Sequence, residues 1–185
     1  METKKAIRKQ MQTKRNELLK EQREAAERRI FESVISMKEF KQSSQILLYM
    51  AHGSEVSTKA LLSYCLQSKK EIFCPRVTGE GEMDFFRIEG LADFQKGYQQ
   101  ILEPVTTAGF VKQGESLMVL PLVAFDEEKN RLGYGKGYYD RYLQRAEGIC
   151  TCGIAFECQK WQGRLPVDAY DRQLNKIITE SFIYE

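Results

Sequence analysis

Three glycines at alternate positions, Gly133, Gly135 and Gly137, stand in the segment 126–143, which directly follows the most apolar run of the chain. This spacing suits neither a strand nor a helix, and it lets the backbone bring several N–H groups close to a ligand. A helix is expected to begin at Tyr138, and its positive end would face the same place. The segment therefore predicts a cradle for a polyphosphate, although its spacing is neither that of a Walker A motif nor that of the dinucleotide fingerprint.

Charged side chains flank the same glycines. Arg131 and Lys136 would bring two positive charges to the phosphates, and we expect side chains on such a loop to be exposed and to contribute little to a core. Asp140 stands just inside the helix, where a carboxylate could bind the Mg²⁺ that accompanies a nucleotide. The alternative for Asp140 is ordinary stabilisation of a helix N-terminus by a negative charge.

The N-terminal segment is a second candidate for anion binding. Residues 1–41 hold 12 Lys and Arg against 7 Asp and Glu, so they carry +5, whereas the whole chain carries only +2. Lys4 and Arg8 are four residues apart and thus share one face of the expected helix. No acidic partner for this segment is evident in the sequence, which favours an external anion. The alternative is a solvated amphipathic helix.

The hydrophobic pattern predicts alternating strands and helices. Residues 4–40 have helical spacing with a break near 19–22, and a helix capped by Ser57 is expected over 58–67. Another helix should cover 138–145. Strands are expected at 45–50, 71–75, 83–88, 117–125, 149–156 and 176–182. This order predicts an α/β fold with a mostly parallel sheet and helices on both faces, in which ligands bind at the carboxyl ends of the strands.

Length and composition limit the remaining possibilities. The chain of 185 residues is 42% hydrophobic and 29% charged, which is typical of one globular domain. Its longest apolar runs, such as 117–124, are far below the roughly 20 residues that a membrane span needs. The N-terminus has no apolar block followed by a small-residue cleavage site. We therefore expect a cytoplasmic protein that does not cross a membrane.

The five cysteines are an odd number with no C-x-x-C pair among them, so we expect buried, reduced thiols rather than disulfides or a zinc site. Cys150 and Cys152 would face one side of a strand, which leaves a weak thiol site with Cys158 as the alternative.

The segment 130–140, together with Lys4, Arg8 and the segment 48–55, closely resembles the 5-formyltetrahydrofolate cyclo-ligase family, whose members are also called methenyltetrahydrofolate synthetases. The resemblance runs nearly end to end, and the glycine loop is specific to the family. It implies a ribose-phosphate-isomerase-like fold in a single domain over residues 1–185, with the helical segment 1–41 packed on it. It also implies ATP-dependent conversion of 5-formyltetrahydrofolate, with or without a polyglutamate chain, to 5,10-methenyltetrahydrofolate, ADP and phosphate, with Mg²⁺ as cofactor.

The resemblance also implies roles for individual residues, carried over by position. Catalytic roles fall to Arg131, Lys136 and Tyr138, and Mg²⁺ ligation falls to Asp140 and Asp171. The implied ATP-binding residues are Lys4, Arg8, Arg131, Leu132, Gly133, Tyr134, Gly135, Lys136, Gly137, Tyr138 and Tyr139. The implied substrate-binding residues are Leu48, Glu55, Tyr134, Gly135, Lys136, Gly137 and Tyr138.

Two positions depart from the family pattern. Many members have glycine in place of Lys136, and Asn175 replaces a carboxylate that usually follows four residues after the metal-binding Asp171. Asp168 is therefore an alternative second ligand of the metal.

Several other side chains each allow two roles. Glu55 is placed to accept hydrogen bonds from pterin N–H groups, and the sole histidine, His52, is either catalytic or a polar loop residue. Tyr138, Tyr139 and Trp161 either stack on adenine or pterin or belong to the core.

The implied chemistry suits these residues. Transfer of the ATP γ-phosphoryl group to the formyl oxygen creates a leaving group, and the N10 amine then attacks the carbon and closes the ring. Phosphoryl transfer asks a protein mainly for positioning and charge neutralisation, so no side-chain nucleophile is needed. Two other readings are a kinase acting on another small molecule and a non-catalytic nucleic-acid module. The net charge of only +2 argues against nucleic acid, and none is expected as a partner.

Overall fold

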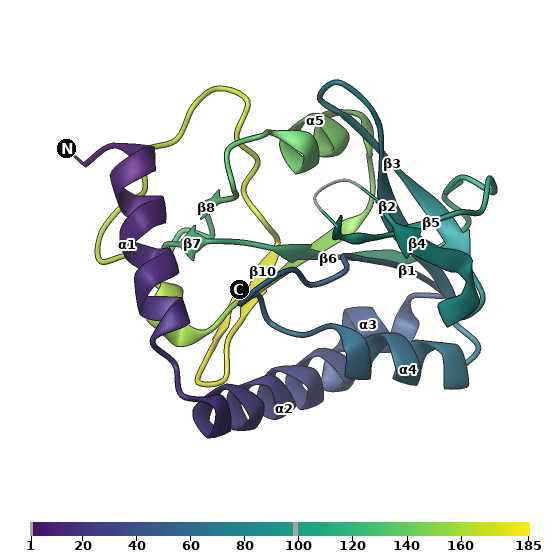
Figure 1. Cartoon of the computed structure of the whole chain (residues 1–185), viewed down its shortest axis with the longest axis horizontal. Helices are drawn as coiled ribbons and strands as arrows, with labels where there is room; N and C mark the ends of the chain where they lie inside the picture. The colour runs from purple at the N-terminus through teal and green to yellow at the C-terminus, as the bar shows by residue number, and fades with distance from the viewer. Residues whose placement is uncertain (1, 98–99) are drawn as a thin grey trace.

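The computed structural model describes residues 2–97 and 100–185, and in this part of the chain seven strands form one central sheet in the order β11-β10-β9-β6-β1-β2-β3 (Figure 1). The strands are β1 (Gln45–Leu48), β2 (Glu71–Gly79), β3 (Glu82–Ile88), β6 (Ser116–Pro121), β9 (Cys150–Ile154), β10 (Lys176–Ile178) and β11 (Ile183–Tyr184). The five inner strands are parallel, and β3 and β11 pair antiparallel at the two edges. The predicted mostly parallel sheet is confirmed, whereas the ribose-phosphate-isomerase-like assignment stays a prediction.

Helices cover both faces of this sheet, as predicted. Figure 1 shows α2, α3 and α4 on one side and α5 on the other, with α1 beside one end of the sheet. Their bounds are α1 (Lys4–Asn16), α2 (Lys20–Ser36), α3 (Lys38–Gln42), α4 (Lys59–Gln67) and α5 (Tyr138–Arg145). The predicted break in the N-terminal helical segment is confirmed, since α1 ends at Asn16 and α2 begins at Lys20.

The alternation of side chains along the strands creates two core layers. Ile46 and Leu48 of β1 pack with α2, α3 and α4, whereas Leu47 points to the opposite face, where it packs in one cluster with Tyr142 of α5. All four side chains are buried. Because both faces are covered, β1 and β6 read as continuous apolar runs rather than as alternating polar and apolar residues.

The chain reverses its direction of travel across the sheet between β1 and β6. From β1 it proceeds to β2 and β3 on one side, and then crosses to β6, β9 and β10 on the other. In a parallel sheet this switch leaves a crevice beyond the carboxyl ends of the two central strands. The topology therefore places the expected ligand site next to the residues that follow β1 and β6.

Several predicted elements differ in extent from the observed ones. The apolar run 117–125 is not one strand, because β6 ends at Pro121 and the chain then forms β7 (Ala124–Phe125), which pairs with β8 (Arg131–Leu132) in a separate small sheet. Proline cannot donate a ladder hydrogen bond, which suits the end of a strand.

The C-terminal strand predicted over 176–182 is also shorter. It ends at Ile178, after which the chain turns into the antiparallel β11.

α4 begins one residue later than predicted, and several small elements were not predicted. Thr58, rather than Ser57, precedes α4, and its hydroxyl donates to the Tyr49 carbonyl oxygen at 2.8 Å. The remaining elements are the hairpin of β4 (Phe94–Lys96) and β5 (Leu102–Pro104) and the 3₁₀ turns η1 (Leu91–Asp93) and η3 (Glu157–Gln159).

The N-terminal helices share buried clusters with the rest of the chain. Ile7 and Met11 of α1 pack against Val123, which directly precedes β7, and against Leu132 of β8, which directly precedes the glycine loop. Burial of two large apolar side chains contributes about 1.5–3 kcal/mol each. The helix that carries the predicted basic pair is therefore fixed beside the predicted phosphate loop.

All five cysteines are free thiols, as predicted. Burial raises the pKa of each, to about 12 for Cys65, so little reactive thiolate forms at neutral pH. Among residues 2–97 and 100–185, no helix is both long and apolar enough to cross a membrane.

Candidate active site

A cavity of about 340 Å³ opens at the carboxyl ends of the central strands. Tyr49 and Met50, which follow β1, and Pro121, the last residue of β6, line it. This is the crevice that the switch in strand order predicts. The glycine loop, α1 and the segment before β10 supply most of its polar side chains.

The cavity brings together the predicted site residues with one exception. Those that line it are Lys4, Arg8, Glu55, Arg131, Leu132, Gly133, Tyr134, Gly135, Lys136, Gly137, Tyr138, Tyr139, Asp140 and Asp171. Leu48 is the exception, because its side chain is fully buried in the core between the sheet and α2 to α4. β1 ends at Leu48, and the next two residues, Tyr49 and Met50, line the cavity while they also pack in the same core cluster.

Two glycines of the loop have backbone conformations that other residues adopt only with strain. Gly135 has φ +92° and Gly137 has φ +71°. A Cβ atom on Gly135 would stand 3.2 Å from the Arg8 guanidinium carbon, and one on Gly137 would stand 2.8 Å from a guanidinium nitrogen of Arg141. The positive φ values favour glycine at both positions, whereas the two arginine side chains could move away from an added Cβ.

Gly137 is the residue before α5, and as a glycine it has no side chain that could cap this end of the helix. The positive end of the α5 dipole therefore lies at the cavity wall, where it favours an anionic ligand.

Arg131 does not have the exposed side chain that its place near the glycine loop predicted. It lies on β8, its side chain is only 3% exposed, and its Nη2 donates to Asp140 Oδ1 at 2.7 Å. Its Nε is buried and has no hydrogen-bond partner among the described residues. Pairing with β7 pulls the residue inward, so Arg131 belongs both to the cavity wall and to the folded structure.

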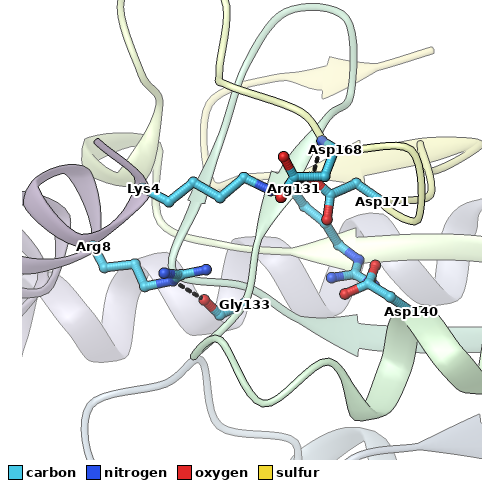
Figure 2. A network of polar contacts seen from close by, with 7 residues as sticks. All are labelled: Lys4, Arg8, Arg131, Gly133, Asp140, Asp168 and Asp171. Carbon is cyan, nitrogen blue, oxygen red and sulfur yellow. Dashed lines mark hydrogen bonds and ion pairs between the residues drawn. The ribbon is translucent and has the colours of Figure 1, made fainter. Parts of the chain in front are cut away.

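Lys4 and Arg8 extend from the same side of α1 toward the loops that line the cavity (Figure 2). Arg8 Nε donates to the Gly133 carbonyl oxygen at 2.7 Å. Lys4 forms ion pairs with Asp168, at 2.6 Å, and with Asp171. The expectation that the basic segment has no acidic partner in the chain is wrong for Lys4, because the tertiary fold brings two carboxylates to it from more than 160 positions away.

Lys136 differs from the other three cations that line the cavity. It is exposed, and its ammonium group forms no hydrogen bond or ion pair with the described residues. Its carbonyl oxygen accepts a bond from Arg141, which fixes the loop backbone. The Lys136 side chain is therefore anchored at its base and has its charge available for a ligand.

The predicted metal ligands, Asp140 and Asp171, each pair with a predicted ATP-binding cation. Asp168 lines the cavity as well, and its N–H donates to Asp171 at 2.8 Å. Asn175 points elsewhere, since its side-chain oxygen accepts bonds from the backbone and hydroxyl of Thr151 on β9. The side-chain amide of Asn175 thus links the segment before β10 to β9, and Asn175 is not among the residues that line the cavity.

These carboxylates fit a metal that is held jointly with a nucleotide. Within the described residues, no group of three or more His, Cys, Asp or Glu side chains is arranged to bind a metal alone. Mg²⁺ is usually bound by one or two carboxylates together with phosphates and waters. Asp140 and Asp171 supply oxygen donors of that kind.

Glu55 is buried, although it is a carboxylate. Its Oε2 accepts a bond from the His52 N–H at 2.7 Å, and Tyr134 forms a side-chain hydrogen bond with it. Burial raises the pKa of Glu55, and these hydrogen bonds and the charge of Arg15 oppose that effect. A partly desolvated carboxylate that lines a cavity is a strong acceptor for ligand N–H groups. His52 lines the same cavity with an exposed side chain, and its catalytic role stays a prediction.

The three aromatic candidates have different positions. Tyr138 and Tyr139 line the cavity and also pack on the core. Trp161 does not line the cavity, because it packs against the cluster that holds Ile7 and Met11. Trp161 is therefore a core residue, and the two tyrosines remain as candidates to stack on a ligand ring.

Sequence reasoning missed the apolar wall of the cavity. These residues are Tyr49, Met50, Pro75, Val77, Met83, Ile101 and Pro121, with Glu103 among them. Those at the ends of β1 and β6 could have been found, because their strands were predicted and the carboxyl ends of parallel strands form the ligand crevice. The others come from β2, β3, β5 and the segment before β5, and only the folded hairpins bring them to the cavity.

Comparisons with known proteins agree with this geometry. Residues 1–180 match the 5-formyltetrahydrofolate cyclo-ligase family. The 5-formyltetrahydrofolate cyclo-ligase of Haemophilus influenzae is 31% identical over 163 residues, which cover 85% of this chain and 87% of the relative.

Two solved structures are similar along nearly the whole chain. The solution structure of a 5,10-methenyltetrahydrofolate synthetase from Aquifex aeolicus is 34% identical, with a TM-score of 0.86 over 97% of this chain and 91% of that one. The Mycoplasma pneumoniae 5,10-methenyltetrahydrofolate synthetase is 27% identical, with a TM-score of 0.78 over 97% and 99% of the two chains. With a match over nearly its full length and the family's glycine loop in the cavity wall, the chain belongs to the 5-formyltetrahydrofolate cyclo-ligase family.

Proposed function

We propose that this protein converts 5-formyltetrahydrofolate and ATP to 5,10-methenyltetrahydrofolate, ADP and phosphate. The γ-phosphoryl group of ATP moves to the formyl oxygen, which makes that oxygen a good leaving group. The N10 amine attacks the activated carbon and loses its proton. Phosphate then leaves with the former formyl oxygen, and the five-membered ring is closed.

One observation carries this proposal: Lys4, Arg8, Arg131 and Lys136 converge with the glycine loop on a single cavity at the switch in strand order. Four cations and the N-terminal end of α5 suit a triphosphate, whose charge must be neutralised during transfer. No nucleophilic side chain is required, because the substrate supplies both the oxygen that accepts the phosphoryl group and the amine that closes the ring.

One cavity would have to hold both substrates. We propose that the buried carboxylate of Glu55 accepts hydrogen bonds from pterin N–H groups, and that Tyr134 and Tyr138, which line the same cavity, contact both ligands. The proposed phosphate contacts come from the cations and from residues 131–139. We propose catalytic roles for Arg131, Lys136 and Tyr138, which also line the cavity.

We further propose that Mg²⁺ binds with the nucleotide through Asp140 and Asp171. The metal would supply charge neutralisation at the phosphates when bound. In the protein itself, Arg131 and Lys4 balance the charges of these two carboxylates. We also infer that the chain forms one domain and acts in the cytoplasm.

Purified protein mixed with ATP, Mg²⁺ and 5-formyltetrahydrofolate tests this function directly. We expect the absorption of the methenyl product to appear, with one ADP formed for each product molecule. Omitting ATP should abolish the signal. ATP hydrolysis that responds to another acceptor but not to the folate would indicate a kinase, and tight, salt-sensitive binding of RNA without turnover would indicate a nucleic-acid module.

The metal assignment leads to a prediction for Asp171→Asn. This variant should need at least about tenfold more Mg²⁺ for half-maximal activity, since even loss of an outer partner of a metal ligand costs about 10- to 100-fold in affinity. Its melting temperature should change little, because the lost ion pair with Lys4 is partly solvated.

Asp168→Asn is the matched comparison. It removes the other, more exposed carboxylate that pairs with Lys4 and should leave the Mg²⁺ requirement unchanged. If the Mg²⁺ concentration needed for half-maximal activity rises in Asp168→Asn but not in Asp171→Asn, the metal ligand is Asp168 rather than Asp171.

The environment of Glu55 predicts a pH dependence. When ionised, Glu55 accepts hydrogen bonds with both carboxylate oxygens, whereas protonation turns one of them into a donor. Burial raises the pKa of Glu55, so this protonation occurs at a higher pH than for an ordinary glutamate. KM for 5-formyltetrahydrofolate should therefore rise as the pH falls through this raised pKa. Glu55→Gln should have a higher KM that no longer depends on pH in this range.

Steady-state kinetics from neutral to acidic pH, with the exposed Glu89→Gln as control, give the comparison. An acid-dependent rise in KM that persists unchanged in Glu55→Gln would remove Glu55 from the substrate contacts.

A further inference from the structure

Arg15 is a buried cation that lies outside the cavity. It stands near the end of α1, and only 3% of the residue is exposed. Arginine is almost never buried without partners, because removing a charge from water is costly. Its contacts therefore indicate what this arginine does.

The guanidinium group of Arg15 joins two loops that both line the cavity. Its Nε donates to the Ser54 hydroxyl at 3.0 Å, and its Nη2 donates to the Tyr134 hydroxyl at 2.8 Å. The guanidinium carbon also lies 5.8 Å from the centre of the Tyr134 ring. The planar fork of arginine can make both bonds at once, which the single ammonium of lysine does less well.

Residues from the end of α1 and from α2 also contact the loop that contains Ser54. The Ser54 hydroxyl donates to Asn16, and the Ser54 carbonyl oxygen accepts a bond from Arg23 of α2 at 2.6 Å. Arg23 also donates to the Arg15 carbonyl oxygen at 2.7 Å. The end of α1 and the start of α2 therefore fix the loop that leads into Glu55.

The contacts of Arg15 lead on to the buried carboxylate. Tyr134, which accepts the bond from Arg15, forms a side-chain hydrogen bond with Glu55. Glu55 and Tyr134 both line the cavity, whereas Arg15 does not. Arg15 can thus influence a ligand indirectly, through Tyr134 and through the loop that leads into Glu55.

One face of α1 contacts two parts of the site. Lys4, Arg8 and Arg15 are separated by four and seven residues, which keeps them on the same stripe of a helix. The first two reach Asp171 and Gly133 beside the proposed phosphate site, while Arg15 reaches the loop of Glu55.

We propose that Arg15 is a positioning residue that holds the Tyr134 hydroxyl and the Glu55 loop in the arrangement that binds the folate. This role rests on the proposed cyclo-ligase function. On this proposal, Lys4 and Arg8 in the first half of α1 contribute to ATP binding, and Arg15 in its last turn contributes to binding of the folate.

Arg15→Met tests the role by its selectivity between substrates. KM for 5-formyltetrahydrofolate should rise about tenfold or more, because the bonds to a charged donor are lost, while KM for ATP should change less than about twofold. Lys14→Met, an exposed neighbour on the same helix, is the matched control and should change neither constant. Equal increases in both KM values would show a general distortion and overturn the role.

A double-variant cycle identifies the route. Tyr134→Phe removes the hydroxyl and should also raise KM for the folate. If Arg15 acts through that hydroxyl, the double variant Arg15→Met and Tyr134→Phe should resemble Arg15→Met alone. If the fold-increase in KM for the folate in the double variant equals the product of the two single fold-increases, Arg15 does not act through Tyr134.

Equilibrium binding of 5-formyltetrahydrofolate without ATP keeps this proposal distinct from the proposed function. Absence of turnover in the unaltered protein would refute the function, whereas normal turnover with unchanged folate binding in Arg15→Met would refute only the positioning role. Should Arg15→Met fail to fold, Ser54→Ala and Tyr134→Phe remove its partners without altering α1. Unchanged folate affinity in both would then overturn the proposal.

Discussion

Lys136→Ala should lower kcat/KM for ATP about 10- to 150-fold, which corresponds to about 1.5–3 kcal/mol for a charge-assisted contact with phosphate. The melting temperature should stay within about 1 °C of the unaltered protein, because surface substitutions that remove no internal contact rarely change stability. The reason is specific to this lysine. It lines the cavity, is exposed and has no hydrogen bond or ion pair through its ammonium group within the described residues.

Lys112→Ala is the matched control for Lys136→Ala, since Lys112 is an exposed lysine that does not line the cavity. It should have full activity. Steady-state kinetics with varied ATP and thermal melting without ligand are sufficient for both variants. Normal kcat/KM for ATP in Lys136→Ala would mean that the glycine loop does not present this charge to the nucleotide.

Asp140→Ala should have the largest effect on stability among the site residues. It would leave the Arg131 guanidinium, whose side chain is 3% exposed and whose Nε already has no partner, without its carboxylate. Breaking a buried pair costs about 3–5 kcal/mol, and the lower end applies because 21% of the Asp140 side chain is exposed. A loss of about 3 kcal/mol corresponds to a melting temperature lower by about 6–12 °C.

A double variant separates this stability effect from catalysis. Arg131→Met combined with Asp140→Leu removes both charges, so it should recover more than half of the lost stability while remaining inactive. Denaturant unfolding gives the free energies, and the methenyl absorption gives the activity. Melting of Asp140→Ala within about 2 °C of the unaltered protein would show that water satisfies Arg131 and that the pair does not stabilise the fold.

The sequence was most informative where function depends on local chemistry. Gly135 and Gly137 adopt positive φ values next to arginine side chains, so their alternate spacing directly reflected a backbone requirement. The same holds for the sheet, because an apolar run such as 45–48 predicts a strand covered on both faces wherever it is placed. These features depend on residues that are close together in the chain, and short-range sterics and hydrophobic periodicity are sufficient to predict them.

Leu48 marks the limit of that reasoning. A strand was predicted over 45–50, and the observed strand ends at Leu48. Whether each residue lies in the core or at the cavity depends on the helices and loops packed around the strand end. Leu48 lies wholly in the core, and Tyr49 and Met50 reach the cavity wall.

The sequence by itself thus determined the order of the main strands and helices, a glycine loop with two positive φ values and the residue types that the chemistry needs. Only the tertiary structure decided which charges meet. It paired Lys4 with Asp171, buried Arg131 against Asp140 and placed Arg15 between two loops of the cavity. The physical reason is that an ion pair or hydrogen bond depends on distance in space and on burial. Residues as far apart in the chain as Lys4 and Asp171, or Arg15 and Tyr134, come within contact distance only when the fold brings their segments together. Arg131 and Asp140 are nearer in sequence, but their burial too is set by the tertiary packing around them.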